Sequence, residues 1–293
     1  MDTSTIDTVT KAKILTEALP YIQRFRDSIF VVKYGGSFMD EHDTEMEAKI
    51  ATDIVLLSSI GIRVAVVHGG GKAISRAMKN KSPQFIQGLR VTDRETIATV
   101  EQTLNHKVNP EICALMTKQG GRPLSVLGES ILRCKKMEIQ NERGETIDLG
   151  YVGEVTEVDT PTLNNALENG AIPIISSLAI NQAGELCNTN ADVAAAMVAS
   201  TLQARRLVYL SDVPGLLSDP DDPESLISTL PVAKVESLKK SGVIRKGMLP
   251  KVDSAVRALL SGIHRVHFID ARVPHSLLLE IFTDKGIGTE IVH

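Results

Sequence analysis

The composition of the chain excludes several classes of protein. It has 293 residues, a formal net charge of −4 at pH 7 and three separated cysteines, Cys113, Cys134 and Cys187. A negative net charge offers no basic surface to nucleic acid, and the cysteine spacing fits neither a zinc site nor a disulfide framework. The N-terminus is polar, and no apolar run reaches the roughly 18 residues that a membrane helix needs. We therefore expect a cytoplasmic protein with no nucleic-acid or membrane partner.

The N-terminal segment predicts an amphipathic helix over roughly Thr8–Arg26. Its apolar residues recur at helical spacing and form one stripe: Ile14, Leu15, Ala18, Leu19, Ile22 and Phe25. Pro20 lies inside this segment and predicts a kink. The pattern does not decide whether the stripe packs on its own subunit or on another.

After residue 28, short apolar runs alternate with longer helical patterns. The runs predict strands over Ile29–Val32, Arg63–Val67, Pro123–Leu127, Ile172–Ser176, Leu207–Leu210 and Arg265–Ile269. The patterns between them predict helices, among them Glu45–Ile60, Ala73–Lys79, Arg94–Lys107, Ala191–Thr201 and Lys251–Ser261. Buried β-branched runs separated by helices indicate an α/β fold, with a mostly parallel sheet and helices on both faces.

Two segments depart from this alternation. Residues 131–158 show short alternating stretches around a turn at 141–144, which predicts inserted β-hairpins that form either a substrate lid or a surface decoration. Residues 218–225 are acidic and contain two prolines, so we expect a solvated loop there.

Two lysines lie in segments that suit phosphate binding. Lys33 ends the first apolar run and is followed by Tyr34 and two glycines, and the second run ends in His68 and three glycines. Lys251 lies where a loop gives way to an apolar helix. Glycines at strand ends let backbone N–H groups approach an anion closely, and a lysine adds a mobile positive charge. These segments therefore predict a polyphosphate site.

Neither familiar phosphate fingerprint is present. A P-loop needs a glycine where Val66 stands and Ser or Thr where Ala73 stands. The glycine spacing of a dinucleotide fold also fails, because Ile74 occupies the position of its last glycine. A P-loop enzyme and a dinucleotide-dependent oxidoreductase are both disfavoured.

Six motifs together resemble one family. They are Lys33-Tyr-Gly-Gly, His68-Gly-Gly-Gly, Gly88-Leu-Arg-Val-Thr, Cys187-Asn-Thr-Asn-Ala-Asp192, Leu210-Ser-Asp-Val-Pro-Gly215 and Gly247-Met-Leu-Pro-Lys251. In this order and over nearly the whole chain they resemble the amino-acid-kinase family. The third and fourth motifs favour its members that phosphorylate N-acetyl-L-glutamate over its aspartokinases and uridylate kinases.

The resemblance implies a fold and a reaction. The fold is a three-layer sandwich in two lobes, with an oligomerisation helix at 1–27, an acylamino-acid lobe at 28–183 and an ATP lobe at 184–293. In the reaction, ATP phosphorylates the γ-carboxylate of N-acetyl-L-glutamate, an early step of arginine biosynthesis. We expect Mg²⁺ to come with ATP and to be held by phosphate oxygens and water, since no residues show metal-ligand spacing.

The resemblance assigns catalysis to Lys33, Lys251 and Asp192. The chemistry is consistent with this, because a γ-carboxylate is ionised at neutral pH and needs no general base. It needs relief from repulsion by the γ-phosphate, which two ammonium groups can give. An aspartate between them would position both lysines and keep both charged, although an N-cap is the simpler reading of Asp192. His68 is then structural rather than a base.

The resemblance also implies the binding residues. Arg90 and Asn188 match positions that bind acetylglutamate, and Arg90 offers a bidentate fork to its α-carboxylate. Backbone N–H groups would bind the γ-carboxylate at Gly70 and Gly71, and the phosphates at Gly35 and Gly36. Asp212 matches the turn that contacts the base or ribose of the nucleotide.

Members of the family that are inhibited by arginine resemble this chain at both ends. They carry the N-terminal kinked helix and a similar C-terminal segment, so Tyr21, His267 and Glu280 are expected to line a pocket for L-arginine. A carboxylate such as Glu280 accepts a guanidinium fork. The helices of such enzymes interlace dimers into a hexamer, a trimer of dimers. A PII-type signalling protein is a further candidate partner.

Two other readings stay open. A nucleotide-binding arginine sensor with little turnover would not need to keep all three catalytic residues. A kinase for acylated aminoadipate differs by one methylene in its substrate, which amounts to about 1–3 kcal/mol and leaves no trace in the motifs.

Overall fold

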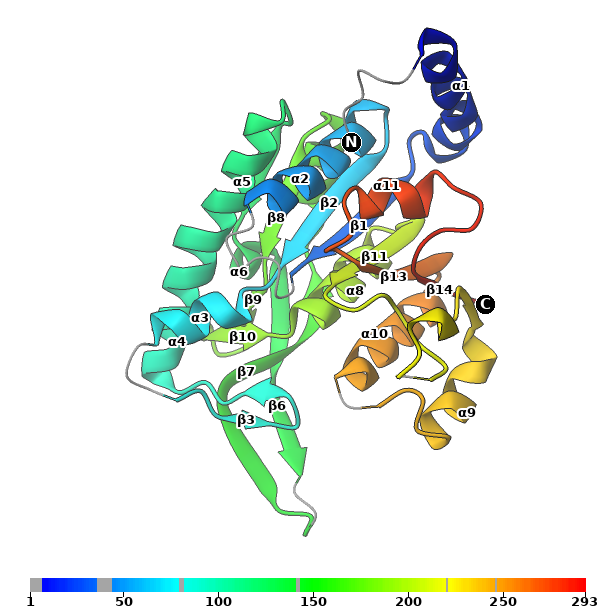
Figure 1. Cartoon of the computed structure of the whole chain (residues 1–293). Coiled ribbons are helices and arrows are strands. Elements are labelled where there is room, and N and C mark those ends of the chain that lie inside the picture. Colours follow the sequence, from blue (N-terminus) through cyan, green and yellow to red (C-terminus); the bar gives the residue numbers. More distant parts are fainter. Residues whose placement is uncertain (1–6, 36–43, 79–81, 141–142, 220, 246) are drawn as a thin grey trace.

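The architecture is described from a computed structural model of the chain. It describes residues 7–35, 44–78, 82–140, 143–219, 221–245 and 247–293. Figure 1 shows a central sheet between helical layers, with α1 at one end of the molecule. Among the described residues, no helix is long and apolar enough to cross a membrane.

The central sheet has eight strands in the order β12-β14-β13-β11-β1-β2-β8-β5. Every neighbouring pair is parallel except β13–β14. In chain order the strands are β1 (Ile29–Tyr34), β2 (Arg63–His68), β5 (Pro123–Val126), β8 (Ile172–Ser176), β11 (Arg206–Ser211), β12 (Thr229–Pro231), β13 (Arg265–Asp270) and β14 (Thr289–Val292). The six strands predicted from the sequence are all confirmed within one or two residues, and the sheet is mostly parallel as expected.

Helices cover both faces of this sheet. One face carries α7 (Pro161–Glu168), α8 (Ala191–Thr201) and α10 (Met248–Leu260), and the other α2 (Thr44–Ser59), α5 (Asn109–Lys118) and α11 (Ser276–Ile281). On β1, Val31 packs in the first core, while Phe30 and Val32 pack in the second. Because successive strand residues point to opposite faces, an uninterrupted apolar strand is stable only with both faces covered. The predicted three-layer α/β fold is confirmed.

A small second sheet stands beside the first. Strands β6 (Leu132–Gln140), β7 (Thr146–Val158), β9 (Leu178–Asn181) and β10 (Leu186–Thr189) close into a four-stranded barrel. The antiparallel pair β6–β7 confirms the hairpin predicted between 131 and 158. Strands β9 and β10, and with them the closure of the barrel, were not predicted from the sequence.

The remaining elements are short or peripheral. Helix α1 (Thr8–Phe25) has Pro20 inside it and Asp7 as its N-cap. A short hairpin joins β3 (Phe85–Ile86) to β4 (Leu89–Arg90). The other helices are α3 (Gly71–Ala77), α4 (Arg94–Thr103), α6 (Gly128–Ile131) and α9 (Val235–Lys240), and a π-helical turn (Leu104–Val108) joins α4 to α5.

Candidate active site

The carboxyl ends of β1 and β2 meet where the sequence predicted a phosphate site. The strands pair in parallel, so Lys33 and Tyr34 lie beside Val67 and His68. A Cβ atom on Gly35 would lie 3.1 Å from Lys33 Nζ, and one on Gly70 would lie 2.6 Å from Leu104 Cδ2. Any side chain at these two positions would therefore crowd the lysine or the helix behind the loop.

Asp192 lies between the two predicted catalytic lysines. Its Oδ1 is 3.1 Å from Lys33 Nζ and its Oδ2 is 2.7 Å from Lys251 Nζ. Asp192 and Lys33 are each 8% exposed, so both charges are shielded from water. The structure thus brings together three residues that are separated by up to 218 positions in the chain (251 minus 33).

The charges of this triad depend on one another. Burial would raise the pKa of Asp192, but the ammonium groups of Lys33 and Lys251 outweigh burial and lower it to about 2. Burial also lowers the pKa of Lys33, and Asp192 opposes that effect. The prediction that the aspartate keeps both lysines fully charged was therefore incomplete, because it left out the desolvation of Lys33.

Neighbouring side chains hold the triad in place. Asn190, not Asp192, is the N-cap of α8, and its Oδ1 accepts hydrogen bonds from the backbone N–H of Asp192 at 2.8 Å and Val193 at 3.4 Å. This cap leaves the Asp192 carboxylate free for the lysines. Tyr209 Oη donates to Asp192 O at 3.2 Å and lies 2.7 Å from Ser254 Oγ. Ser254 Oγ in turn donates to Lys251 O at 2.9 Å, so α8 and α10 are joined behind the site.

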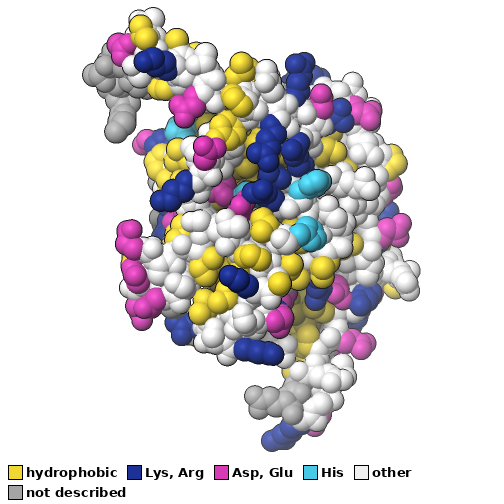
Figure 2. Space-filling model, turned by 90° about the vertical axis from the view of Figure 1, so that its right-hand side faces the viewer, with side chains coloured by type: hydrophobic (Ala, Val, Ile, Leu, Met, Phe, Trp, Pro, Cys, Tyr) yellow, Lys and Arg dark blue, Asp and Glu magenta, His cyan; other side chains and the backbone are white. Residues whose placement is uncertain are grey.

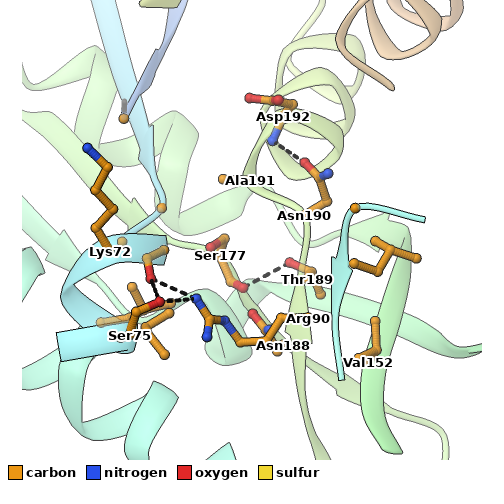
Figure 3. Close-up of a pocket in the computed structure, with 18 of the residues that line it drawn as sticks. Lys72, Ser75, Arg90, Val152, Ser177, Asn188, Thr189, Asn190, Ala191 and Asp192 are labelled. Atoms are coloured by element: carbon orange, nitrogen blue, oxygen red, sulfur yellow. Dashed lines mark hydrogen bonds between the residues drawn. The ribbon is translucent and has the colours of Figure 1, made fainter. Parts of the chain in front are cut away.

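A cavity of about 440 Å³ opens beside this triad (Figure 3). The predicted site residues that line it are Lys33, Gly35, Gly70, Gly71, Arg90, Asn188 and Asp192. Ser75, Phe85 and Ser177 line it as well, although they lie in none of the six motifs, and so does Thr189 of the fourth motif. Lys251 contacts the cavity residue Asp192 from α10.

Arg90 and Asn188 lie together at one end of the cavity, as Figure 3 shows. Asn188 Nδ2 donates to Thr92 Oγ1 at 3.3 Å, and Thr92 Oγ1 donates to Arg90 O at 2.8 Å. The Arg90 guanidinium donates to Gly71 O at 2.7 Å and Ser75 Oγ at 2.8 Å, and lies 4.8 Å from the Phe85 ring centre. Burial lowers the pKa of Arg90. The β3–β4 hairpin thus places a cation against the glycine loop.

His68 is enclosed behind the same loop. It is fully buried, its Nδ1 is 3.0 Å from Gly69 O and its Nε2 is 3.1 Å from Asn109 Nδ2. Since the amide donates to Nε2, Nδ1 carries the proton and donates to Gly69 O. Burial lowers the pKa of His68 to about 4, so the ring is neutral at pH 7. These contacts agree with a structural role.

A π-helical turn contributes a wall that the sequence did not reveal. The pattern predicted one helix over Arg94–Lys107, whereas helix α4 ends at Thr103 and a wider turn follows. Leu104 in this turn lines the cavity and packs against Gly70. Such turns inside helices are frequently found at functional sites.

For two of the predicted nucleotide residues, Gly36 and Asp212, nucleotide binding stays a prediction. Gly36 lies outside the described residues. Asp212 follows β11 and is exposed, and its charge helps to raise the pKa of Lys33 against the effect of burial. Its contact with a nucleotide stays a prediction.

The three residues predicted to bind L-arginine also lie around one cavity. Tyr21, His267 and Glu280 line a second cavity of about 140 Å³ between α1, β13 and α11. Glu280 Oε1 is 2.7 Å from His267 Nδ1, and Oε2 accepts from the backbone N–H groups of Ile287 at 2.8 Å and Gly288 at 2.9 Å. Burial would raise the pKa of Glu280, but these donors lower it. The carboxylate is therefore charged.

The chain is similar to known proteins over nearly its whole length. A model of the amino acid kinase family matches residues 28–270, and the chain belongs to this family. It is 44% identical over 285 residues to an acetylglutamate kinase of Methanothrix thermoacetophila, which covers 96% of this chain and 98% of that one. It is 43% identical over 296 residues to that of Aquifex aeolicus, covering 97% and 98%. Within the family, the chain groups with the acetylglutamate kinases.

Solved structures support the fold. An N-acetylglutamate synthase from Neisseria gonorrhoeae, complexed with coenzyme A and N-acetyl-glutamate, matches with a TM-score of 0.84 and 30% identity. The match covers 98% of this chain and 64% of the synthase, so the chain spans about two thirds of that protein. A complex with coenzyme A and L-arginine matches with a TM-score of 0.81 and 28% identity, and an isopentenyl phosphate kinase at 18% identity shares the fold.

Proposed function

We propose that the chain transfers the γ-phosphoryl group of ATP to the γ-carboxylate of N-acetyl-L-glutamate, an early step of arginine biosynthesis. The observation that carries this proposal is the Lys33–Asp192–Lys251 triad, with Lys33 and Asp192 buried, at the edge of the cavity. The identity to acetylglutamate kinases over nearly the whole chain supports it.

The two lysines would act on charge rather than on protons. The attacking carboxylate and the γ-phosphate repel each other, and the transfer reaction is accelerated by positioning and by fixed positive charge. Lys33 lies on the glycine-loop side of Asp192 and would span the attacking and transferred groups. Lys251 lies on the α10 side and would reach the transferred group from the ATP side. Both ammonium groups pair with the Asp192 carboxylate, so their positions depend on each other.

The opposite end of the cavity suits the amino-acid part of the substrate. Arg90 would bind the α-carboxylate as a fork, and Asn188 would hydrogen-bond the acetylamide. Backbone N–H groups at Gly70 and Gly71 would receive the γ-carboxylate, which places it between Arg90 and Lys33. All five residues line one cavity.

ATP would bring its own metal. Within the described ranges, no group of three His, Cys, Asp or Glu residues could hold a metal ion. Mg²⁺ usually keeps several waters and binds phosphate oxygens in kinase sites. We therefore assign no protein ligand to Mg²⁺, and we place the nucleotide beside Gly35, Gly36 and Asp212.

One assay separates the candidate activities. ADP release would be followed with N-acetylglutamate, glutamate, aspartate, carbamate and acetylated aminoadipate as acceptors. The proposal expects N-acetylglutamate to give the highest kcat/KM. Preference for the aminoadipate derivative would identify the longer substrate, and no turnover with any acceptor would favour a sensor.

Substitution of Arg90 by lysine should weaken the binding of N-acetylglutamate but not that of ATP. We expect Arg90→Lys to raise the KM for N-acetylglutamate about tenfold, since it removes a charge-assisted fork but keeps the charge. The KM for ATP should stay nearly unchanged. Steady-state kinetics with each substrate varied in turn would check this, with Arg122→Lys on the surface as control. A change in the ATP constant instead would place Arg90 at the nucleotide.

We further propose that L-arginine inhibits the enzyme by binding beside Glu280. His267 Nδ1 lies 2.7 Å from Glu280 Oε1, and in a neutral ring that donates there Nε2 is an acceptor. This Nε2 is buried, and the described residues offer it no hydrogen-bond partner. A guanidinium could donate to Nε2 and to the carboxylate together, and the Tyr21 hydroxyl, now 2.5 Å from Asp284, stands at the α1 side.

The same proposal includes a hexamer built through α1. The helix leaves large apolar side chains exposed, namely Val9, Ile14, Leu15 and Leu19. An apolar stripe of this kind commonly marks an interaction site. In a trimer of dimers, a neighbouring subunit would cover it and would couple the arginine pocket to the other subunits.

Removal of α1 tests the assembly. We expect a variant lacking residues 1–26 to form active dimers with a weakened arginine response, because Tyr21 and the apolar stripe are both lost. Light scattering and inhibition curves, run beside the full chain, would check this. A full-length dimer in solution would refute the hexamer and leave the kinase assignment intact.

A further inference from the structure

Four arginines converge on the face of the molecule that carries the end of β14. Arg24, Arg205, Arg206 and Arg265, which we call the arginine cluster, line a cavity of about 440 Å³ together with Thr229, His264, Glu290, Val292 and His293. Figure 2 shows Lys and Arg side chains gathered on this side of the molecule, with histidines beside them. The gathering is unexpected in a chain whose formal net charge is −4.

Three members of the cluster surround a single ring. The guanidinium carbons of Arg24, Arg205 and Arg206 lie 5.5, 5.2 and 5.3 Å from the centre of the Phe25 ring. Cations at such distances are attracted to the ring, but that attraction is worth only about 0.5–2 kcal/mol. It orients the guanidinium groups without neutralising them.

The described part of the chain supplies little negative charge to this cavity. Glu290 is the one acidic side chain among the described residues that line it, and it pairs with Arg265 at 2.5 Å. Arg205 donates to Arg24 O at 2.7 Å and Ser28 Oγ at 3.3 Å, and Arg206 donates to Arg205 O at 3.0 Å. These acceptors are neutral, so the cluster keeps an excess of positive charge.

Arg206 is the buried member of the arginine cluster. It is 5% exposed, and burial together with the charges of Arg265, Arg205 and Arg24 lowers its pKa to about 10, although the Glu290 carboxylate opposes this effect. A buried charge without a counterion is strongly destabilising. Four guanidinium groups and one carboxylate line this cavity, so the excess of positive charge indicates a place for a further anion.

We propose that this cavity binds a small oxyanion of the phosphate class carrying at least two negative charges. Guanidinium groups match the oxygens of phosphate through parallel N–H donors, and several forks around one cavity would hold one tetrahedral group. The space is ample, since a water molecule occupies only about 30 Å³ of liquid. The ligand could be free phosphate or the diphosphate of a larger molecule.

Binding of inorganic phosphate and of pyrophosphate to the full-length chain tests the site. Isothermal titration at constant ionic strength, balanced with chloride, should show specific binding to the wild type. Arg24→Gln should weaken it about tenfold, because one charge-assisted contact is lost. The Arg24 side chain is exposed, so this substitution removes charge without opening the core. Arg205→Gln serves as a second variant.

Controls separate this site from the two others. Arg122→Gln, on the surface elsewhere, should bind as the wild type does. Glu280→Gln should also leave binding intact, although Arg24, Arg206 and Arg265 line the arginine pocket as well. Phosphate held at the active site would respond to Lys251→Ala and not to Arg24→Gln.

The possible results decide the proposal. Tighter binding of pyrophosphate would identify a diphosphate ligand, and equal affinity would identify a single phosphate group. If both anions bind no better than chloride, or if Arg24→Gln and Arg205→Gln bind like the wild type, the arginine cluster is not an oxyanion site.

Discussion

Replacement of Lys251 or Lys33 by alanine should lower kcat by about 10²–10³. The triad places both ammonium groups on one buried carboxylate, so they are fixed before the reaction begins. Removal of one leaves developing charge on the transferred phosphoryl group without a partner, which matters more in the transition state than in the ground state. The KM values for both substrates should therefore change far less than kcat.

Steady-state kinetics would check this prediction. Lys49→Ala is a matched control, since Lys49 also pairs with a carboxylate, Glu45 at 2.6 Å, but lies on α2. Circular dichroism would confirm that each variant is folded. A Lys251→Ala enzyme with near-normal turnover would refute the assigned mechanism.

Replacement of Glu280 should abolish inhibition by L-arginine. Glu280 supplies the buried negative charge of the second cavity and also accepts two backbone N–H groups. Glu280→Gln keeps an amide oxygen for those donors and removes the charge, so the loop can stay in place. Glu280→Ala removes both. The reaction velocity would be measured against arginine up to the millimolar range. The velocity of Glu280→Ala should not change with arginine. Glu280→Gln should still be inhibited, with a higher inhibition constant than the wild type.

The control for this experiment is catalysis without arginine. The kcat and kcat/KM of both Glu280 variants should match the wild type, because Glu280 lies outside the cavity of the lysine triad. Wild-type kinetics that do not change with millimolar arginine would refute the regulatory proposal alone. Retained inhibition in Glu280→Ala would move the arginine site elsewhere.

Local patterns predicted much of the fold. A parallel strand that is covered on both faces is an uninterrupted run of apolar residues. Such runs predict the ends of β1 and β2 to within two residues. The glycine loops were also predictable, because lysines and glycines at strand ends leave a direct trace in the sequence. The three-layer fold could therefore be predicted from the sequence.

Contacts between distant segments could not be predicted in the same way. Tyr209 looked like one residue of a buried strand, yet its hydroxyl joins Asp192 to Ser254. The closure of the small barrel depends on which strands pair, and short strands such as β9 and β10 carry too few residues to specify partners. The arginine cluster is likewise invisible in sequence, because Arg24 and Arg265 are 241 positions apart (265 minus 24).

The central claim is that the chain makes an acyl phosphate from ATP and N-acetyl-L-glutamate. Acyl phosphates react with hydroxylamine, so the product can be trapped as a hydroxamate and counted against ADP. We predict one hydroxamate for each ADP with N-acetyl-L-glutamate, and formation of both products about 10²–10³ times slower in Lys251→Ala. ADP released without hydroxamate, or hydroxamate formed equally well from unacetylated glutamate, would contradict the claim.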